Sequence, residues 1–278
     1  MIRQSRRKRL VLVPVLALLL AVSGCFQRLE PGAVSQPGDP IELLEAGQLK
    51  TCTHLPYPPF QSTENDEIVG FDVDVVDEVA KRIGANQVIF DTSFEGIETG
   101  QSFEIGDCDV AAAGMTITPE RERVMDFSDP YFDALQSLLV RTGSDISSLA
   151  DLRGKTLGVQ QGTTGEEYAT REQQKNGYRT IQFEDLALLQ TAVLTGRVEA
   201  GINDNGVLYD YAKDNPKTTV SAEFDTGDRY GIAVRKGNGA LLAKINEVLA
   251  QIEADGTYDQ LYLKWFGRKP DSSDERER

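Results

Sequence analysis

Apolar and polar positions in the first part of the chain alternate in the manner of strands followed by helices. Residues 50–54 and 87–90 are short runs typical of strands. Between them, apolar residues recur at helical spacing over residues 72–83, which predicts a helix capped by Asp72. Residues 109–115 form a third run of small apolar residues, which predicts a strand buried on both faces.

A second series of the same kind follows. Thr163 or Thr164 begins its first helix, since Thr164 and Glu167 have the spacing of a capping box. The series comprises strands at residues 155–160, 180–183, 198–202 and 230–235, and helices at residues 163–175, 186–194 and 241–252. Strands that alternate with helices in two series predict an α/β fold of two lobes with parallel sheets.

The end of the strand at residues 109–115 carries a group of residues suited to an anion. Gly114 allows close approach to the backbone, and Thr116 supplies a hydroxyl. Thr118 and Pro119 fit the N-cap and first position of a helix, which places Arg121 in its first turn. Because that turn already carries partial positive charge, a guanidinium there indicates a carboxylate cradle. An exposed arginine balanced by its two neighbouring glutamates is the alternative.

Five residues that could contact a small molecule follow predicted strands. They are Tyr57, Thr116, Arg121, Thr163 and Asp204. Because sites in open α/β sheets lie beyond the carboxyl ends of strands, we expect one shared cleft rather than scattered surface residues.

The first 24 residues have the pattern of an export signal. A basic head precedes an apolar run at residues 10–22 that is too short to span a bilayer. Residues 22–25 (Val-Ser-Gly-Cys) resemble a bacterial lipobox, which implies cleavage before Cys25 and a lipid on its thiol. An ordinary secretory signal with an incidental cysteine is the alternative. Residues 25–40 then indicate a flexible tether, and residues 268–278 form a charged tail.

The charge of the chain excludes one class of partner. The net charge is −15, and loss of the five basic residues of the signal takes it to −20. Such an acidic surface repels nucleic acid, so we exclude nucleic-acid binding. His54 is the only histidine, and without neighbouring cysteine or histidine partners it predicts no metal site.

Cys52 and Cys108 remain as an even pair if Cys25 carries a lipid. Each opens a predicted strand, and neighbouring strands lie at the spacing that a disulfide requires. A disulfide here would stabilise the fold by about 3–4 kcal/mol. Two buried free thiols are the alternative.

Six short motifs occur in a fixed order along the chain. They are residues 57–60 (Tyr-Pro-Pro-Phe), 70–74 (Gly-Phe-Asp-Val-Asp), 114–121 (Gly-Met-Thr-Ile-Thr-Pro-Glu-Arg), 127–131 (Phe-Ser-Asp-Pro-Tyr), 158–164 (Gly-Val-Gln-Gln-Gly-Thr-Thr) and 230–237 (Tyr-Gly-Ile-Ala-Val-Arg-Lys-Gly). With these motifs the chain resembles the family 3 extracellular solute-binding proteins, the amino-acid receptors of ATP-driven importers.

The resemblance implies the two-lobed periplasmic-binding-protein fold, type II, with two crossover strands at the hinge. The first lobe would comprise residues 41–134 and 230–267, and the second lobe residues 135–229. The two lobes would close on an amino acid.

The resemblance also implies how that ligand would be held. Arg121 would bind its carboxylate, helped by Gly114 and Thr116, and Thr163 or Thr164 would reach the same carboxylate from the second lobe.

At the other end of the ligand, Asp204 would bind the α-ammonium, while Tyr57 and Phe94 would clamp the side chain. Two core aromatics and a helix-capping aspartate are the alternative interpretations of these three residues. His54 either contacts the ligand side chain or is structural.

We therefore predict binding without catalysis, and neither cofactor nor metal. The expected partners are an amino acid, an ABC permease and its ATPase. We also expect an exported monomer anchored by lipid to the outer face of the cell membrane. The rival hypotheses are an enzyme on the same scaffold, such as a cyclohexadienyl dehydratase, and a sensory lipoprotein that serves no importer.

Overall fold

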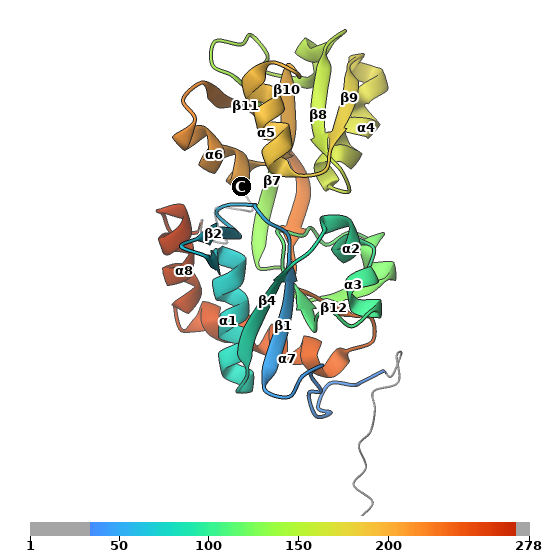
Figure 1. Ribbon diagram of the computed structural model, residues 1–278, viewed down its shortest axis with the longest axis vertical. Coiled ribbons are helices and arrows are strands. Elements are labelled where there is room, and N and C mark those ends of the chain that lie inside the picture. Colours follow the sequence, from blue (N-terminus) through green and yellow to red (C-terminus); the bar gives the residue numbers. More distant parts are fainter. Residues whose placement is uncertain (1–33, 271–278) are drawn as a thin grey trace, which may run out of the picture. The chain divides into compact units, whose positions relative to one another are not determined.

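The computed structural model describes residues 34–270, which contain two five-stranded sheets (Figure 1). The strand order is β4-β1-β5-β12-β6 in the first sheet and β11-β7-β10-β8-β9 in the second. We call each sheet with its helices a lobe. The export signal, Cys25 and residues 271–278 lie outside the described residues.

The first lobe contains β1 Gln48–Thr53, the β2 Ser62–Glu64 and β3 Glu67–Val69 hairpin, β4 Asn86–Asp91, β5 Val110–Ala111, β6 Met125–Phe127 and β12 Ala233–Arg235. Its helices are α1 Phe71–Ile83, α2 Phe94–Glu98, α3 Gln101–Glu104, α7 Gly239–Ala254 and α8 Thr257–Phe266, with a 3₁₀ turn at Arg121–Arg123. Helix α1 packs on β4 and against α7 and α8.

The second lobe contains β7 Phe132–Arg141, β8 Thr156–Gln160, β9 Arg179–Phe183, β10 Ala200–Asp204 and β11 Thr218–Tyr230. Its helices are α4 Thr164–Asn176, α5 Leu186–Thr195 and α6 Asn205–Asp214, with a 3₁₀ turn at Leu149–Leu152. Leu189 and Val193 of α5 pack so closely on Gly201 of β10 that a β-carbon there would lie 2.4 Å from the Leu189 side chain.

The prediction of parallel sheets was only partly right, because both sheets are mixed. β1 pairs in parallel with β4 and β5, and β8 with β9 and β10. The strands that cross between lobes enter in the opposite direction, so β12 is antiparallel to β5 and β6, and β7 is antiparallel to β10 and β11. A strand that arrives directly from the other lobe lacks the crossover helix that parallel pairing requires.

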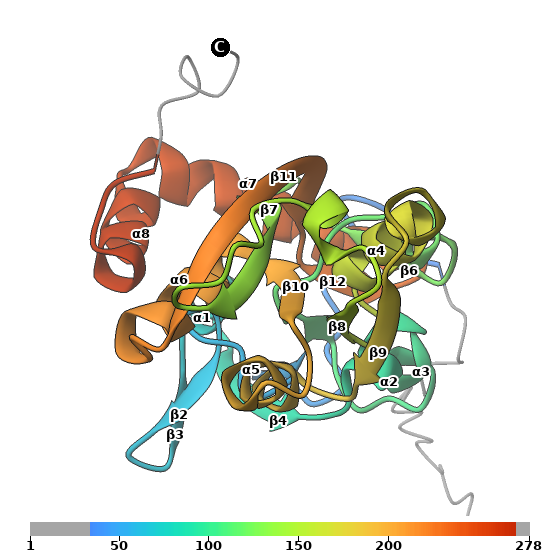
Figure 2. The same cartoon turned by 90° about the horizontal axis from the view of Figure 1, so that it is seen from above.

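Two long strands connect the lobes. β7 leads from the first lobe into the second, and β11 returns. They pair with each other from Thr218 opposite Arg141 to Tyr230 opposite Phe132, side by side in both views (Figure 2). Phe60 packs against the rings of Phe132 and Tyr230, at 4.9 and 5.1 Å between centroids, so aromatic packing holds the ends of both strands.

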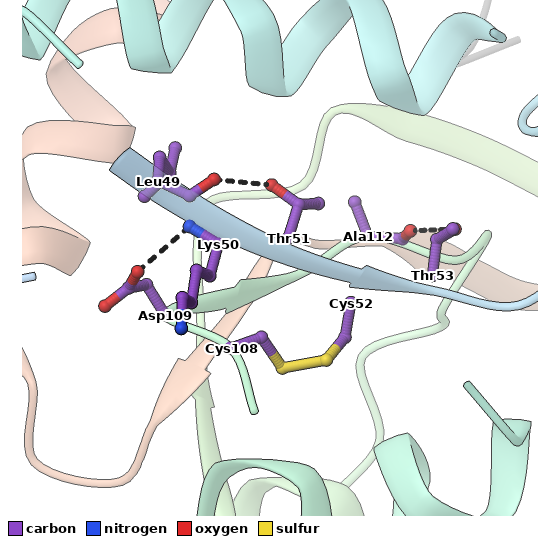
Figure 3. Close-up of a disulfide and its surroundings, with 8 residues drawn as sticks. All are labelled: Leu49, Lys50, Thr51, Cys52, Thr53, Cys108, Asp109 and Ala112. Atoms are coloured by element: carbon purple, nitrogen blue, oxygen red, sulfur yellow. Dashed lines mark hydrogen bonds between the residues drawn. A yellow bond between two sulfur atoms is a disulfide. The ribbon is translucent and has the colours of Figure 1, made fainter. Parts of the chain in front are cut away.

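Cys52 and Cys108 form a disulfide with 5.6 Å between their α-carbons (Figure 3). Cys52 lies on β1, and Cys108 directly precedes Asp109, whose carboxylate accepts from the Lys50 amide. The pairing of β1 with β5 therefore brings the two cysteines together.

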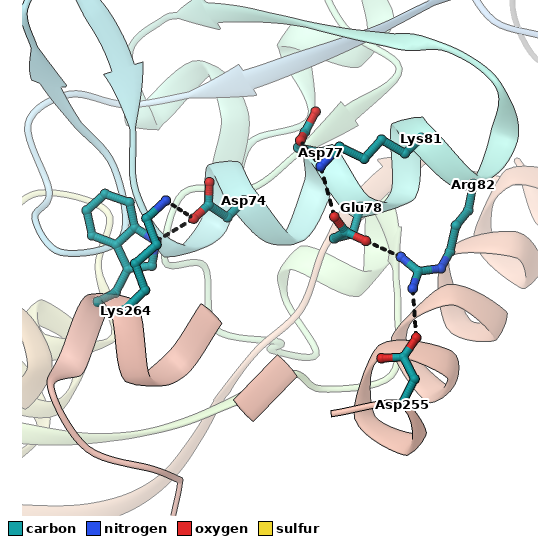
Figure 4. Close-up of polar contacts among 8 residues, drawn as sticks. Asp74, Asp77, Glu78, Lys81, Arg82, Asp255 and Lys264 are labelled. Atoms are coloured by element: carbon teal, nitrogen blue, oxygen red, sulfur yellow. Dashed lines mark hydrogen bonds and ion pairs between the residues drawn. The ribbon is translucent and has the colours of Figure 1, made fainter. Parts of the chain in front are cut away.

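Helix α1 is held to the C-terminal helices by charged side chains (Figure 4). Arg82 bonds Glu78 on its own helix and lies 3.0 Å from Asp255, while Lys264 pairs with Asp74. Such partly exposed pairs near the surface each contribute modestly to stability.

Asp72 does not cap α1, contrary to the sequence prediction. The N-cap is Gly70, and Asp72 lies inside the helix with 1% of its surface exposed. Its carboxylate accepts hydrogen bonds from the Tyr131 hydroxyl at 2.7 Å and from the Gly114 amide at 2.7 Å. Burial raises the pKa of Asp72 to about 7 despite these bonds.

The expected tether is held to the first lobe near its end. Ser35 forms a β-bridge with Asn238, and its amide donates to the Gly237 carbonyl at 2.9 Å. Its hydroxyl accepts from the Ala240 amide at the start of α7. Any free tether must therefore end before Ser35.

Candidate ligand-binding site

A small cavity lies where the two lobes meet, and both lobes contribute to its wall. Its lining residues are His54, Tyr57, Gln61, Phe94, Ala113, Gly114, Thr116, Arg121, Gln160, Thr163, Thr164 and Asp204. All the residues that we predicted to contact a ligand are among them. The volume of the cavity is about 10 Å³, so in this closed arrangement it is too small for an amino acid.

Arg121 is buried in the wall of this cavity. Its guanidinium donates to the Thr116 carbonyl at 2.8 Å and, across the lobes, to the Gly162 carbonyl at 2.9 Å. It lies 5.3 Å from the centre of the Phe94 ring and 4.0 Å from Glu98. Burial lowers the pKa of Arg121, and the negative charge of Glu98 opposes this effect. The buried guanidinium is a cation that a ligand carboxylate would stabilise.

The local structure around Arg121 differs from the sequence prediction. Arg121–Arg123 is a single 3₁₀ turn rather than the first turn of an α-helix. The N-cap residue of this turn is Glu120 rather than the predicted Thr118, although the Thr118 hydroxyl accepts from the Arg121 amide at 3.2 Å. A turn this short has no helix macrodipole, so Arg121 is placed by its backbone partners and by burial.

Asp204, at the end of β10, accepts hydrogen bonds from both lobes. The Tyr57 hydroxyl lies 2.9 Å from its Oδ2, the Tyr230 hydroxyl bonds the same oxygen, and Gln136 donates to Oδ1. Burial raises the pKa of Asp204 to about 6, because these donors only partly replace water around the carboxylate. Asp204 is also the N-cap residue of α6, but its side chain makes no capping bond.

A second buried carboxylate lies beside Asp204. Gln136 Nε2 donates to Asp228 Oδ2 at 2.9 Å as well as to Asp204, and the Thr164 hydroxyl donates to Asp228 at 2.9 Å. Gln136 lies on β7, and its amide thus joins two acids on the strands that flank β7 on either side, β10 and β11. Thr164 is turned toward Asp228, while Thr163 lies on the cavity wall with its hydroxyl donating to the Gln160 carbonyl.

Helix α4 begins one residue earlier than the expected capping box. Thr163 is its N-cap and accepts from the Glu166 amide at 3.2 Å. Glu166 reaches back to the Gly162 amide at 2.8 Å, which satisfies a second free donor at the same helix end. The box predicted from Thr164 and Glu167 was therefore wrong by one position.

Gly114 makes room for Tyr57. Its φ angle is 58°, and a β-carbon there would lie 2.7 Å from the Tyr57 ring. Its amide donates to Asp72, so this N–H is turned away from the cavity. The expectation that this amide helps to bind a carboxylate is therefore not supported by its geometry.

Several lining or supporting residues had no role in the sequence prediction, among them Gln61, Gln136 and Tyr230. Tyr230 lay in a quoted motif, which was its only signal. Within residues 34–270, no group of three or more His, Cys, Asp or Glu side chains is arranged to hold a metal ion. No helix in the same part of the chain is long and apolar enough to cross a membrane.

Two α/β lobes joined by paired strands, with polar residues of both facing a shared cavity, define the class of two-lobed solute-binding proteins. The sequence matches the bacterial extracellular solute-binding proteins, family 3, over residues 49–268, and the chain belongs to that family. It is 33% identical over 235 residues to the putative ABC transporter arginine-binding protein 2 of Escherichia coli, covering 82% of this chain and 95% of that protein.

Solved structures agree with this assignment. An ancestral arginine-binding protein bound to arginine matches with a TM-score of 0.75 and 42% identity, covering 79% of this chain and 98% of its own. The ancestral amino acid-binding protein AncCDT-1, a precursor of cyclohexadienyl dehydratase, matches with a TM-score of 0.72 and 36% identity, covering 79% of this chain and 95% of its own.

Proposed function

We propose that this protein binds a polar amino acid in the cavity between its lobes and delivers it to the permease of an ATP-driven importer. One observation carries the proposal. Arg121 of the first lobe and Asp204 of the second line the same cavity, so that a buried cation and a buried carboxylate are available to the two ends of a zwitterion.

In this proposal Arg121 and Thr116 bind the carboxylate, joined by Thr163 from the second lobe. Asp204 binds the ammonium group. The Phe94 ring, which already contacts the Arg121 guanidinium, covers the ligand together with Tyr57.

Binding would require the lobes to separate, because the cavity is smaller than any amino acid. The polar contacts between the lobes at the cavity would then open, among them those of Tyr57 with Asn203 and Asp204 and that of Arg121 with Gly162. The ligand would replace them with its own charged groups as the lobes close. Hinge closure around a ligand is the established motion of periplasmic binding proteins, and it is the motion that this binding requires.

We further propose that the protein is an exported, monomeric lipoprotein. Cys25 would carry a lipid that holds it at the outer face of the membrane, near its permease and ATPase. We also propose where the lobes divide: the first lobe comprises residues 41–134 and 230–267, and the second lobe comprises residues 135–229. Mass spectrometry of the mature protein would test the lipid at Cys25.

The central test is calorimetric titration of the purified protein with each of the common amino acids. We expect micromolar or tighter binding of at least one polar amino acid. Arg121→Lys should weaken that binding at least about tenfold, because a single ammonium replaces the two-pronged guanidinium. Arg123→Lys, two residues away and exposed, is the matched control. Equal affinity of the two variants would contradict the role of Arg121.

An enzymatic role is the second candidate, and the similarity to the precursor of a dehydratase favours testing it. The relatives described above are binding proteins by name, including that precursor. Turnover of prephenate, followed by ultraviolet absorbance, would support the enzyme; its absence together with tight amino-acid binding would support the receptor.

A further inference from the structure

We propose that the cavity selects amino acids whose side chains end in N–H donors, the amide or guanidinium type, and rejects carboxylate side chains. His54 Nε2 and Gln61 Oε1 would be the selecting atoms. This inference rests on the proposed function, since it concerns the side chain of the amino acid that Arg121 and Asp204 would hold.

His54 presents a hydrogen-bond acceptor at the cavity. Its Nδ1 lies 2.9 Å from the Thr92 carbonyl oxygen. Because a carbonyl only accepts, Nδ1 must carry the proton, and Nε2 of the neutral ring is then an acceptor. Nε2 is buried and has no partner within residues 34–270, and His54 lines the cavity.

Gln61 presents a second acceptor. Its Nε2 donates to the His54 carbonyl oxygen at 3.3 Å, which fixes the orientation of the amide. The residue has 0% of its surface exposed, and its Oε1 atom is left buried and without a partner in the described part of the chain. Gln61 also lines the cavity.

The loop after β1 holds these atoms in place. Tyr57 and Gln61 form a β-bridge, with the Tyr57 amide 2.8 Å from the Gln61 carbonyl and the Gln61 amide 3.1 Å from the Tyr57 carbonyl. The centres of the Phe94 and His54 rings lie 6.4 Å apart, and the Arg121 guanidinium lies 5.3 Å from the centre of the Phe94 ring. A ligand whose carboxylate is at Arg121 would therefore extend its side chain along Phe94 toward His54.

Two unpartnered acceptors favour one kind of ligand group. A buried acceptor costs free energy until a donor reaches it, and an N–H-bearing side chain supplies that donor. A carboxylate side chain has no hydrogen to donate and would face both lone pairs. Among the lining residues Arg121 is the one cation, and it would be paired with the α-carboxylate of the ligand. The nearby acids Glu98, Asp204 and Asp228 add to the repulsion of a second ligand carboxylate.

Glutamine and glutamate give the sharpest test, because they differ only in the chemistry of the terminal group. Calorimetric titration of the purified full-length protein should show glutamine or arginine binding at least about 100-fold more tightly than glutamate, since a site built for a donor leaves its acceptors unpaired otherwise. Whether glutamine or arginine binds more tightly would distinguish an amide from a guanidinium ligand, and either result supports the proposal.

Variants assign the effect to the two residues. His54→Phe and Gln61→Met each remove one acceptor at similar volume, and we expect each to reduce the preference over glutamate at least about fivefold. Gln190→Met is the matched control, because Gln190 lies on α5, is buried, has an unpartnered amide nitrogen and does not line the cavity. Thermal unfolding would establish that each variant folds. If only one of the two variants folds, that one is enough to test the proposal.

The outcomes separate this inference from the proposed function. If no amino acid binds, the proposed function fails and this inference fails with it. If amino acids bind but glutamate or an apolar amino acid binds as tightly as glutamine and arginine, this inference alone is overturned. An unchanged preference in folded His54→Phe or Gln61→Met would overturn the assignment to these residues.

Discussion

The hydroxyl of Tyr57, in the first lobe, lies 2.9 Å from Oδ2 of Asp204, in the second. The same hydroxyl lies 2.7 Å from Oδ1 of Asn203. Burial and the charge of Asp204 raise the pKa of Tyr57 well above its ordinary value, so this side chain remains a donor. One phenol therefore contributes directly to keeping the lobes together.

Removing that hydroxyl should favour opening. Tyr57→Phe loses the bonds to Asn203 and Asp204, which should cost about 1–2 kcal/mol of the free energy that holds the lobes closed. Small-angle scattering of the ligand-free variant should show a larger radius of gyration than that of the wild type. Tyr178→Phe is the control, because the Tyr178 hydroxyl bonds Ala169 within the second lobe. An equal radius for both variants would refute the prediction.

Ligand affinity should depend on pH through Asp204. In the ligand-free protein its pKa is raised to about 6, and only the carboxylate form binds an ammonium group. Affinity should thus be constant above pH 6 and fall about tenfold for each pH unit below it. Calorimetry from pH 4.5 to 8 would measure this. Asp204→Asn should bind weakly with a flatter profile; a wild-type affinity that stays constant down to pH 4.5 would exclude the role of Asp204.

Stability should depend on pH through Asp72. Its folded-state pKa is raised to about 7, above the ordinary value of an aspartate, so the folded protein binds this proton more tightly than the unfolded chain. The free energy of unfolding should therefore fall as the pH rises from about 4 to 7, by up to the order of 4 kcal/mol. Asp72→Asn can keep one acceptor for Gly114 and a donor for Tyr131, and it does not titrate.

Urea unfolding at pH 4.5 and pH 8 would measure the effect. Asp72→Asn should gain stability relative to the wild type at the higher pH. The same difference between the two proteins at both pH values would show that titration of Asp72 does not affect stability.

The disulfide should contribute strongly to the stability of the first lobe. Cys52 and Cys108 are separated by 56 positions, so the bond shortens a long loop of the unfolded chain. Replacing both with alanine should lower the free energy of unfolding by about 3–4 kcal/mol. Thermal unfolding with and without a reductant provides the check, since reductant should lower the midpoint of the wild type and leave that of the double variant unchanged.

Regular elements could be predicted where local signals were strong. The helices α1, α5 and α7 have clear apolar periodicity and were predicted within a few residues of their observed bounds. Helix α8 was not predicted: among its residues only Tyr262 is buried, so its periodicity is weak. It is held instead by aromatic contacts, such as that of Phe266 with Phe71 at 5.3 Å, and these depend on residues far away in the chain.

The residues of the candidate site also differ in how far the sequence could predict them. Arg121 and Asp204 could be proposed because a charged residue after a strand, within a family motif, is a strong signal. Gln61 and Gln136 could not, because a neutral amide has no distinctive spacing. Their importance arises only when folding places them beside His54 and Asp228, respectively.

The pairing of β7 with β11 has an irregularity between Phe224 and Asp228. Gly227 lies there with a φ angle of 73°, a conformation that glycine adopts easily. Since neighbouring residues of a strand face opposite sides, deleting one residue from this bulge would turn the Asp228 side chain away from Gln136. A change in the number of residues in this bulge of β11 can thus add or remove a buried acid beside Gln136 without any substitution in the cavity wall.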